Sequence, residues 1–305
     1  MSTLDDVVTL ELPFKAPFDW ARLLRFFSGR ATPGVEAVED GAYRRAIDWA
    51  GDSGTLSVRL HPRKRCLVAS LEGPVSHHAD ALTAPIAKIF DLHADPKKIG
   101  AELATDPWLA PLVEAAPGLR VPGAWSGFEL VVRAIVGQQV SVKAATTIIG
   151  RLVQRAGERI DGHPYENTAW RFPTPVALAA VDLAQIGMPG KRVAALQGFA
   201  HAVATGDVPL DSSVVDATSL RAALLALPGI GPWTVEYVAM RAWRDADAWP
   251  AWDLVLMQSI CARDPSLVRP TQQRVRTDTW RPWRAYAAMH LWNEVADRAG
   301  AARGG

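Results

Sequence analysis

Hydrophobic and polar positions alternate in four short stretches near the start of the chain, and these stretches are rich in the β-branched and aromatic residues that strands favour. We expect strands over 7–14, 42–50, 55–62 and 66–73. Two segments between and after them, 18–30 and 77–93, repeat their apolar residues with helical spacing. The pattern predicts an α+β N-terminal domain over residues 1–94, a small antiparallel sheet with helices on one side.

From residue 95 onward the apolar positions repeat with the period of a helix. Ser126 and Glu129 have the spacing of a capping box, which marks a helix start. Further helices are expected after Ser141, twice within 172–206, and over 281–296. Residues 95–305 are therefore expected to form an all-α core.

The stretch Leu227-Pro228-Gly229-Ile230-Gly231 interrupts this helical pattern with a tight turn. A second helix is expected to start at Pro232, because the first turn of a helix does not need the N–H that proline lacks. The two glycines permit left-handed backbone and leave room for a ligand, and N–H groups at a helix N-terminus suit a phosphate. The hairpin, at about 219–243, is thus a phosphate-binding candidate. The alternative is a turn that only reverses the chain.

Composition and charge exclude several classes of protein. The formal net charge is +1, no apolar run is long enough to span a membrane, and the first residues lack the layout of a signal peptide. Cys66 and Cys261 are the only cysteines, which excludes a disulfide scaffold and a four-cysteine cluster. His77 and His78 lack accompanying carboxylates or thiols. We expect a cytoplasmic protein with no membrane segment, no metal and no cofactor.

Local charge is more informative than the net charge. The segment from Ile260 to His290 contains six arginines and two aspartates. This local excess of positive charge predicts one basic, DNA-facing side, with a solvated surface as the alternative. The chain also holds 12 tryptophans, of which most are expected in the core and a few in a pocket that stacks on a planar ligand.

Asp253 stands out because its neighbours are apolar. It lies in the segment Trp249-Pro-Ala-Trp-Asp-Leu-Val-Leu-Met257, where a carboxylate is costly without a structural or chemical reason. One reason is capping of the helix that follows, since aspartate is a favoured N-cap. The other is catalysis, and both roles can coexist. We expect Asp245 and Asp247 to be loop residues and poorer candidates for the catalytic carboxylate.

The hairpin and the downstream aspartate together resemble the helix-hairpin-helix DNA glycosylases. The form L-P-G-I-G-x-W-T-x-x-Y at 227–237 is similar to the 3-methyladenine DNA glycosylase II branch of that superfamily. The resemblance covers nearly the whole chain and is most specific over 126–150 and 224–292. It implies the α+β N-terminal domain followed by a helical core of two subdomains around a cleft.

The resemblance also assigns roles to single residues. It implies a catalytic carboxylate, Asp253, and a base pocket made of Trp233, Tyr237, Trp283, Phe26, Trp252 and Leu254. It implies DNA contacts from Leu227, Gly229, Ile230, Gly231, Thr234, Gln138, Gln139, Lys191 and Arg192. Turn and cap hydrogen bonding is the alternative for the two glutamines, and simple solvation is the alternative for Lys191 and Arg192.

Three positions depart from the pattern of the family or of its other branches. Gln139 stands where an apolar residue wedges into the minor groove, and Leu254 stands where a tyrosine is found. Trp233 occupies the hairpin position where strand-nicking relatives place a nucleophilic lysine. The last departure favours an enzyme without lyase activity.

The function implied is hydrolysis of the N-glycosidic bond of alkylated purines, such as 3-methyladenine and 7-methylguanine, flipped out of duplex DNA. Asp253 would stabilise an oxocarbenium-like sugar or orient water, and an electron-rich aromatic cleft would attract a cationic base. We expect a monomer that acts on double-stranded DNA at the nucleoid. A non-catalytic phosphate clamp, a glycosylase for oxidised or deaminated bases, and a helical protein-interaction module are the competing readings.

Overall fold

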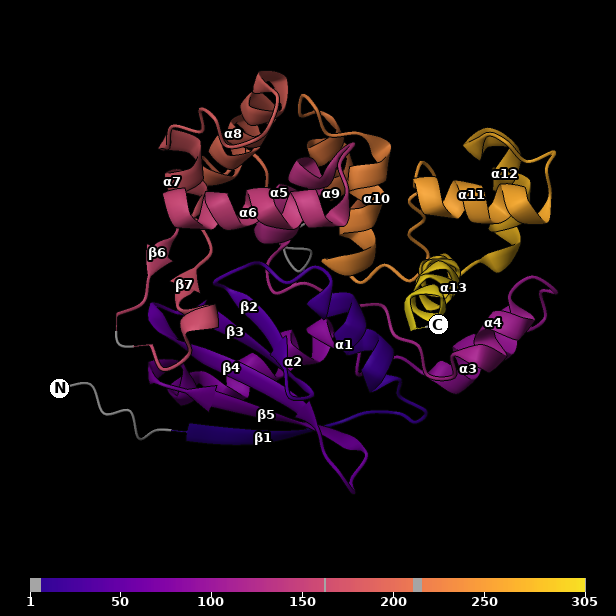
Figure 1. Ribbon diagram of the computed structural model, residues 1–305, viewed down its shortest axis with the longest axis horizontal. Helices are drawn as coiled ribbons and strands as arrows, with labels where there is room; N and C mark the ends of the chain where they lie inside the picture. The colour runs from indigo at the N-terminus through magenta and orange to yellow at the C-terminus, as the bar shows by residue number, and fades with distance from the viewer. Residues whose placement is uncertain (1–6, 162, 211–215, 305) are drawn as a thin grey trace.

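A computed structural model describes residues 7–161, 163–210 and 216–304 of the chain (Figure 1). The termini of the two expected domains, residues 1–6 and 305, lie outside this range. An N-terminal α+β region is followed by a helical region, as expected from the change in periodicity. None of the described helices is both long and apolar enough to cross a membrane.

The N-terminal region is built on one antiparallel sheet of order β1-β5-β4-β3-β2. Its strands are β1 (Val7–Pro13), β2 (Glu36–Glu39), β3 (Ala42–Trp49), β4 (Asp52–Leu60) and β5 (Cys66–Glu72). The four strands expected from alternation are confirmed within a few residues. The edge strand β2 escapes the pattern because four residues are too few to show a period of two.

Helices cover one face of this sheet (Figure 1). They are α1 (Trp20–Ser28), the 3₁₀ helix η1 (Pro74–His78) and α2 (Ala79–Ile89). Asp19 caps α1 by accepting a hydrogen bond from the backbone N–H of Arg22. The apolar sides of α1 and α2 bury a core with the inner side of the sheet, including Leu23, Phe27, Leu56 and Leu71.

The remainder of the described chain is almost entirely helical. Its helices are α3 (Pro96–Leu103), α4 (Ala110–Ala115), α5 (Gly127–Gly137), α6 (Val142–Ala156), α7 (Pro175–Ala180), α8 (Gly190–Ala204), α9 (Ala217–Leu225), α10 (Pro232–Arg241), α11 (Leu254–Arg263), α12 (Pro270–Thr277) and α13 (Arg284–Gly304), with 3₁₀ helices η2 (Glu166–Thr168) and η3 (Asp278–Trp280). A two-stranded ribbon pairs β6 (Glu158–Arg159) with β7 (Trp170–Arg171). Ser126, Ser141 and Thr174 cap their helices as expected from the sequence.

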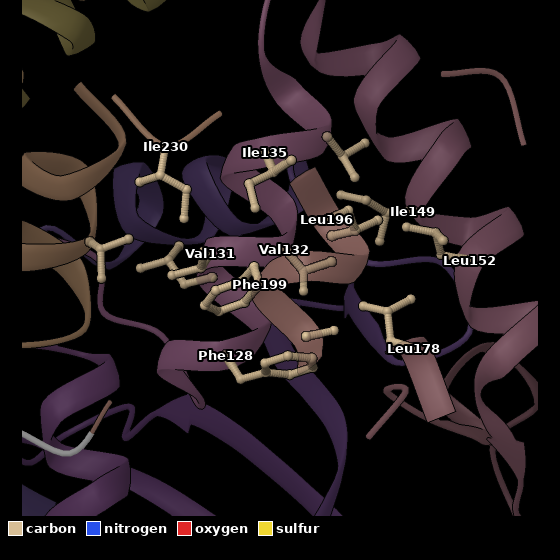
Figure 2. Close-up of a cluster of buried hydrophobic side chains, with 14 of the residues drawn as sticks. Phe128, Val131, Val132, Ile135, Ile149, Leu152, Leu178, Leu196, Phe199 and Ile230 are labelled. Carbon is tan, nitrogen blue, oxygen red and sulfur yellow. The ribbon is translucent and has the colours of Figure 1, made fainter. Parts of the chain in front are cut away.

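The helical region has two hydrophobic cores, which define two subdomains. One lies between α5, α6, α8 and α10, and includes Phe128, Ile135, Leu196 and Ile230 (Figure 2). The other joins α3 and α4 to α11, η3 and α13. Helix α9 belongs to the first core, and α11, which begins after Asp253, belongs to the second, whereas α10 contributes Val238 to the first and Met240 to the second. Helix α10 therefore lies where the two subdomains meet.

A buried ionic network ties the sheet to the helical region. Arg45 of β3 donates to Glu129 of α5 at 2.9 Å, and Arg133 of α5 donates to Glu36 of β2 at 2.8 Å. Burial alone would raise the pKa of Glu36, but Arg133 and Arg45 lower it to about 2. Arg133 also donates to the backbone carbonyl of Arg30. Because breaking a buried pair is costly, this network fixes the end of α1 against α5.

Candidate active site

The carboxylate of Asp253 is held by four uncharged N–H donors. Its Oδ1 accepts from the backbone N–H groups of Val255 and Leu256, at 3.0 and 3.1 Å, and so caps α11. The same oxygen accepts from the indole of Trp292 at 2.9 Å, and Oδ2 accepts from the indole of Trp233 at 3.1 Å. With one donor against three, Oδ2 retains more accepting capacity for a substrate.

The aspartates upstream of Asp253 have different surroundings. Asp245 pairs with Arg221, and Asp247 pairs with Arg281 and Arg284. Asp253 has no ion pair with any residue that the structure describes. The donors to Asp253 are uncharged, so they do not neutralise its negative charge, which is available to a ligand. The arginines that pair with Asp245 and Asp247 do neutralise those carboxylates.

Trp233 and Tyr237 form one wall beside this carboxylate. They lie one turn apart on α10, and their rings stack with centroids 5.1 Å apart and planes 10° apart. The second wall is Trp292 of α13, whose ring meets Tyr237 edge-on at 6.3 Å. Aromatic rings from two subdomains thus converge on Asp253.

Trp292, which the sequence analysis did not name, contacts Asp253 and Tyr237, whereas Trp283 makes other contacts. The indole of Trp283 instead donates to Glu102 of α3, and its ring lies against Tyr286. Trp283 directly precedes α13, which begins at Arg284, whereas Trp292 lies within that helix.

Trp252 and Leu254 flank Asp253 but do not pack with this aromatic group. They are 59% and 66% exposed, and so are among the most exposed large apolar side chains described. Their position on either side of the carboxylate makes an apolar rim that faces solvent. Among the sequence-predicted pocket residues, these two are the most exposed.

Phe26 reaches the site from α1. It is half-buried and packs against both the N-terminal core and the second helical core. The guanidinium carbons of Arg30 and Arg241 lie 4.1 and 4.8 Å from the centre of its ring. Arg241 also donates to the Tyr237 hydroxyl at 2.6 Å. Burial would raise the pKa of Tyr237, but Arg241, Arg30 and Arg133 together lower it.

The hairpin between α9 and α10 is anchored by its apolar residues. Ile230 is buried in the first helical core, as Figure 2 shows, and Leu227 packs against it. Gly229 has φ +82°, and a Cβ there would lie 2.7 Å from Ala195 of α8, so only glycine fits. Gly231 has φ −102° with open space beside it, so of the two glycines only Gly229 uses the left-handed region that both permit.

Unpaired backbone donors point out of this hairpin. The N–H groups of Gly229 and Gly231 have no acceptor within the described part of the chain, and Gly231 caps α10 without a side-chain bond. Uncapped N–H groups at a helix N-terminus favour an anion. The hairpin therefore stays a candidate phosphate site, as the sequence analysis expected.

Gln138 and Gln139 occupy the turn between α5 and α6, and they do different things. Gln138 donates to the carbonyl of Gly229 at 2.9 Å and to the hydroxyl of Thr234 at 3.4 Å. Thr234 is buried, so its side chain faces the protein. Gln139 is exposed in the left-handed region, with φ +57°. The turn therefore presents Gln139 outward and is fastened to the hairpin by Gln138.

Lys191 and Arg192 lie in the first turn of α8, beside the hairpin. The N-cap Pro189 supplies no side-chain bond, and neither basic residue has an ion-pair partner among the described residues. Cations at a helix N-terminus are opposed by the helix dipole, so their presence is explained by an external anion better than by helix stability.

The arginine run between Ile260 and His290 does not form a free basic face. Five of its six arginines pair with carboxylates: Arg263 with Glu294, Arg274 with Asp278, Arg276 with Asp106, and both Arg281 and Arg284 with Asp247 and Asp278. The sequence count missed these partners because several come from distant segments. No group of His, Cys, Asp and Glu among the described residues is arranged to hold a metal ion.

Comparisons with known proteins identify the family to which the chain belongs. A family model described as "HhH-GPD superfamily base excision DNA repair protein" matches residues 132–285, and one described as "AlkA N-terminal domain" matches residues 9–126. The DNA-3-methyladenine glycosylase 2 of Escherichia coli (strain K12) is 34% identical over 284 residues, covering 92% of this chain and 95% of that protein.

Two further relatives differ in length or in similarity. A "Probable bifunctional transcriptional activator/DNA repair enzyme AlkA" of Mycobacterium tuberculosis is 38% identical over 94% of this chain, but the chain spans only 57% of its length. A solved 3-methyladenine DNA-glycosylase from Archaeoglobus fulgidus has the same fold, with a TM-score of 0.78 at 19% identity, covering 93% of this chain and 97% of that chain. The chain belongs to the HhH-GPD superfamily of base excision DNA repair proteins.

Proposed function

We propose that this protein is a monofunctional DNA glycosylase that hydrolyses the N-glycosidic bond of alkylated purines, such as 3-methyladenine and 7-methylguanine, in duplex DNA. The names of its relatives in Escherichia coli and Mycobacterium tuberculosis support DNA repair and the removal of a methylated base. The observation that carries the proposal is Asp253, a carboxylate that has no cationic partner among the described residues and lies between aromatic side chains of α10 and α13.

The arrangement matches what the reaction requires. A stacked base is out of reach, so the nucleotide must leave the duplex. The hairpin N–H groups of Gly229 and Gly231 would hold the backbone, and Gln139 would fill the gap. The base would lie against Tyr237 and Trp292. As the bond breaks, the sugar becomes oxocarbenium-like, and Oδ2 of Asp253 would stabilise that positive charge or orient the attacking water.

The lyase branch of the superfamily is not supported here. A Schiff base requires an amine held at the sugar carbon. Trp233 stands at the hairpin position for that amine, and its indole N–H is engaged with Asp253. The product would therefore be an intact strand that carries an abasic site.

The proposal is tested by incubating the purified protein with methylated duplex DNA and identifying released bases by chromatography. We expect free 3-methyladenine and 7-methylguanine, no strand cleavage before alkali, and no protein–DNA adduct after borohydride. Release of neither base would reject the function. Stoichiometric borohydride trapping that is lost on mutating Lys143 or Lys191 would reject the monofunctional mechanism.

Location and assembly follow from the substrate. We infer a monomer that works at the nucleoid, because one chain carries the carboxylate, the aromatic walls and the hairpin together. Size-exclusion chromatography with light scattering, alone and with a short duplex, tests the assembly: a 1:1 complex is expected.

A further inference from the structure

Cations without carboxylate partners gather on the base side of the site. Arg241 is 3% exposed, and it donates to the backbone carbonyls of Pro122 and Gly123 and to the Tyr237 hydroxyl. None of these acceptors carries a formal charge. The guanidinium of Arg30 makes no hydrogen bond and no ion pair within the described chain. The only described partner of that guanidinium is the ring of Phe26.

The nearby acidic residues do not neutralise these two groups. Glu36 and Glu129 are the buried carboxylates of this region, and they are already matched by Arg45 and Arg133. The network of four residues is thus neutral, and Arg30 and Arg241 remain as an excess of positive charge. Burial lowers the pKa of Arg241, Tyr237 raises it, and the neighbouring guanidinium groups of Arg133 and Arg30 lower it further.

Arg30 is close to the place proposed for the base. Arg30, Phe26 and Trp292 line one cavity of about 110 Å³ between α1 and α13. Trp292 also donates to Asp253, so one indole separates the carboxylate from the cationic cavity. Arg120 lines the same cavity, is 1% exposed, and has two guanidinium nitrogens, Nε and Nη1, without a hydrogen-bond partner in the described residues. The site is therefore electrically polarised, with cations on one side and an anion on the other.

This polarity changes the expectation that the pocket attracts a cationic base. Phe26 and Tyr237 already interact with protein guanidinium groups, so their ring faces are poorly disposed to bind a second cation. A cationic base entering beside Arg30 is repelled by it. The question is then what such a field contributes to the proposed reaction.

The charge of the substrate moves as the bond breaks. When C1′–N9 cleaves, both electrons go to the purine, so an N-alkylated ring that was positive becomes neutral. The positive charge passes to the sugar, where water adds to C1′ and loses a proton. Cations beside the base and a carboxylate beside the sugar both favour this displacement of charge.

Resting on the proposed function, we infer that Arg30 and Arg241 promote departure of the base through their positive charge, by repelling the cationic purine in the ground state while Asp253 attracts the charge that appears on the sugar. The two arginines act at a distance and need no contact with the bond. Specificity for alkylated bases then comes from weakened glycosidic bonds, and not from attraction of the pocket for cations.

Arg30 is the residue to vary, because its side chain is only partly buried and makes no hydrogen bond to the described residues whose loss would disturb the fold. The charge series Arg30→Lys, Arg30→Gln and Arg30→Glu is measured with 7-methylguanine duplex under single-turnover conditions. We expect Lys to stay close to the wild-type rate and each unit of lost charge to slow base release about tenfold, as for charges several ångströms apart at a protein-like effective dielectric constant.

Relative affinity for damaged and undamaged duplex is a second measurement, and it should not change if Arg30 has only a structural role. The half-saturating concentration of the damaged duplex, divided by the dissociation constant for the same undamaged duplex, should fall along the series, because the repulsion of the cationic base is relieved. Rate and relative affinity thus change in opposite directions. Arg25→Gln is the matched control: Arg25 lines the same cavity from α1 but pairs with Asp297, and its rate should stay within twofold of wild type.

The outcomes separate the two ideas. Failure of the wild-type protein to release any base rejects the proposed function, and this inference with it. An active wild type with Arg30→Gln at the same rate and relative affinity rejects only the role of Arg30. A variant that is slow and also binds the damaged duplex less tightly, with circular dichroism unchanged, assigns Arg30 to ground-state binding and overturns the electrostatic mechanism.

Discussion

The hairpin 227–231 and the loop that carries Asp253 are built in opposite ways. The hairpin exposes backbone N–H groups, contains no charged side chain, and is fixed by the burial of Ile230. The Asp253 loop exposes one carboxylate, and its orientation depends on indoles from α10 and α13. A backbone site is specified by residues next to one another, whereas a side-chain site is specified by residues brought together by the fold. The two should therefore fail in different ways when mutated.

Asp253→Asn should have the largest effect. We expect base release to fall by about 10²- to 10³-fold, because the charge that stabilises the sugar is lost. The amide NH₂ would face the N–H of Trp233 or Trp292, and the lost hydrogen bond should cost about 1–2 kcal/mol of stability. Single-turnover chromatography and thermal unfolding measure the two effects. Wild-type release by the folded variant would contradict the assignment, while unchanged affinity for DNA is the expected control.

Trp292→Phe should reduce base release by about tenfold. The phenyl ring preserves the aromatic wall opposite Tyr237 but removes one of the donors that orient Asp253. The matched control is Trp283→Phe, on the same segment, whose indole donates only to Glu102. The same single-turnover assay applies to both variants. If Trp283→Phe were the slower enzyme, the preference for Trp292 over Trp283 would be wrong.

The two hairpin glycines should differ from each other. Gly231→Ala meets open space and an ordinary φ, so stability should be unchanged while affinity for every duplex falls about fivefold. Gly229→Ala combines a positive φ with a clash against Ala195, and should cost about 1–3 kcal/mol of stability. Thermal unfolding and fluorescence anisotropy with two unrelated duplexes measure these effects. If Gly231→Ala and the wild type bound both duplexes with equal affinity, the hairpin would be only a turn that does not contact phosphate.

Lys191→Ala should have the smallest effect. Loss of one phosphate contact should weaken DNA binding about threefold and reduce the slope of log affinity against log salt by about 1. Lys64→Ala, in the turn between β4 and β5 and paired with Glu11, is the control and should leave the slope unchanged. A salt titration followed by fluorescence anisotropy distinguishes the two variants. Identical slopes for both would mean that Lys191 is solvated and does not contact phosphate.

Local patterns in the sequence predicted the elements well, and long-range contacts were beyond them. The alternation and capping signals predicted β1, β3, β4, β5 and most helices, because period and capping are properties of neighbouring residues. Asp253 was singled out by its apolar surroundings, and its N-cap role is confirmed. Trp292 was missed because a helical face is ambiguous until a partner is known. The arginine run was misread because Glu294 and Asp106 are remote in sequence.

One amide has a consequence for how the protein searches DNA. The side-chain amide of Gln138 donates to the carbonyl of Gly229, so the turn that carries Gln139 is attached to the hairpin. On the proposed function, every phosphate held by the hairpin places Gln139 against a base step at a constant offset. As the protein slides along DNA, Gln139 would then test how easily each pair of stacked bases separates. Damaged sites would be detected by weaker base stacking, before the base enters the pocket.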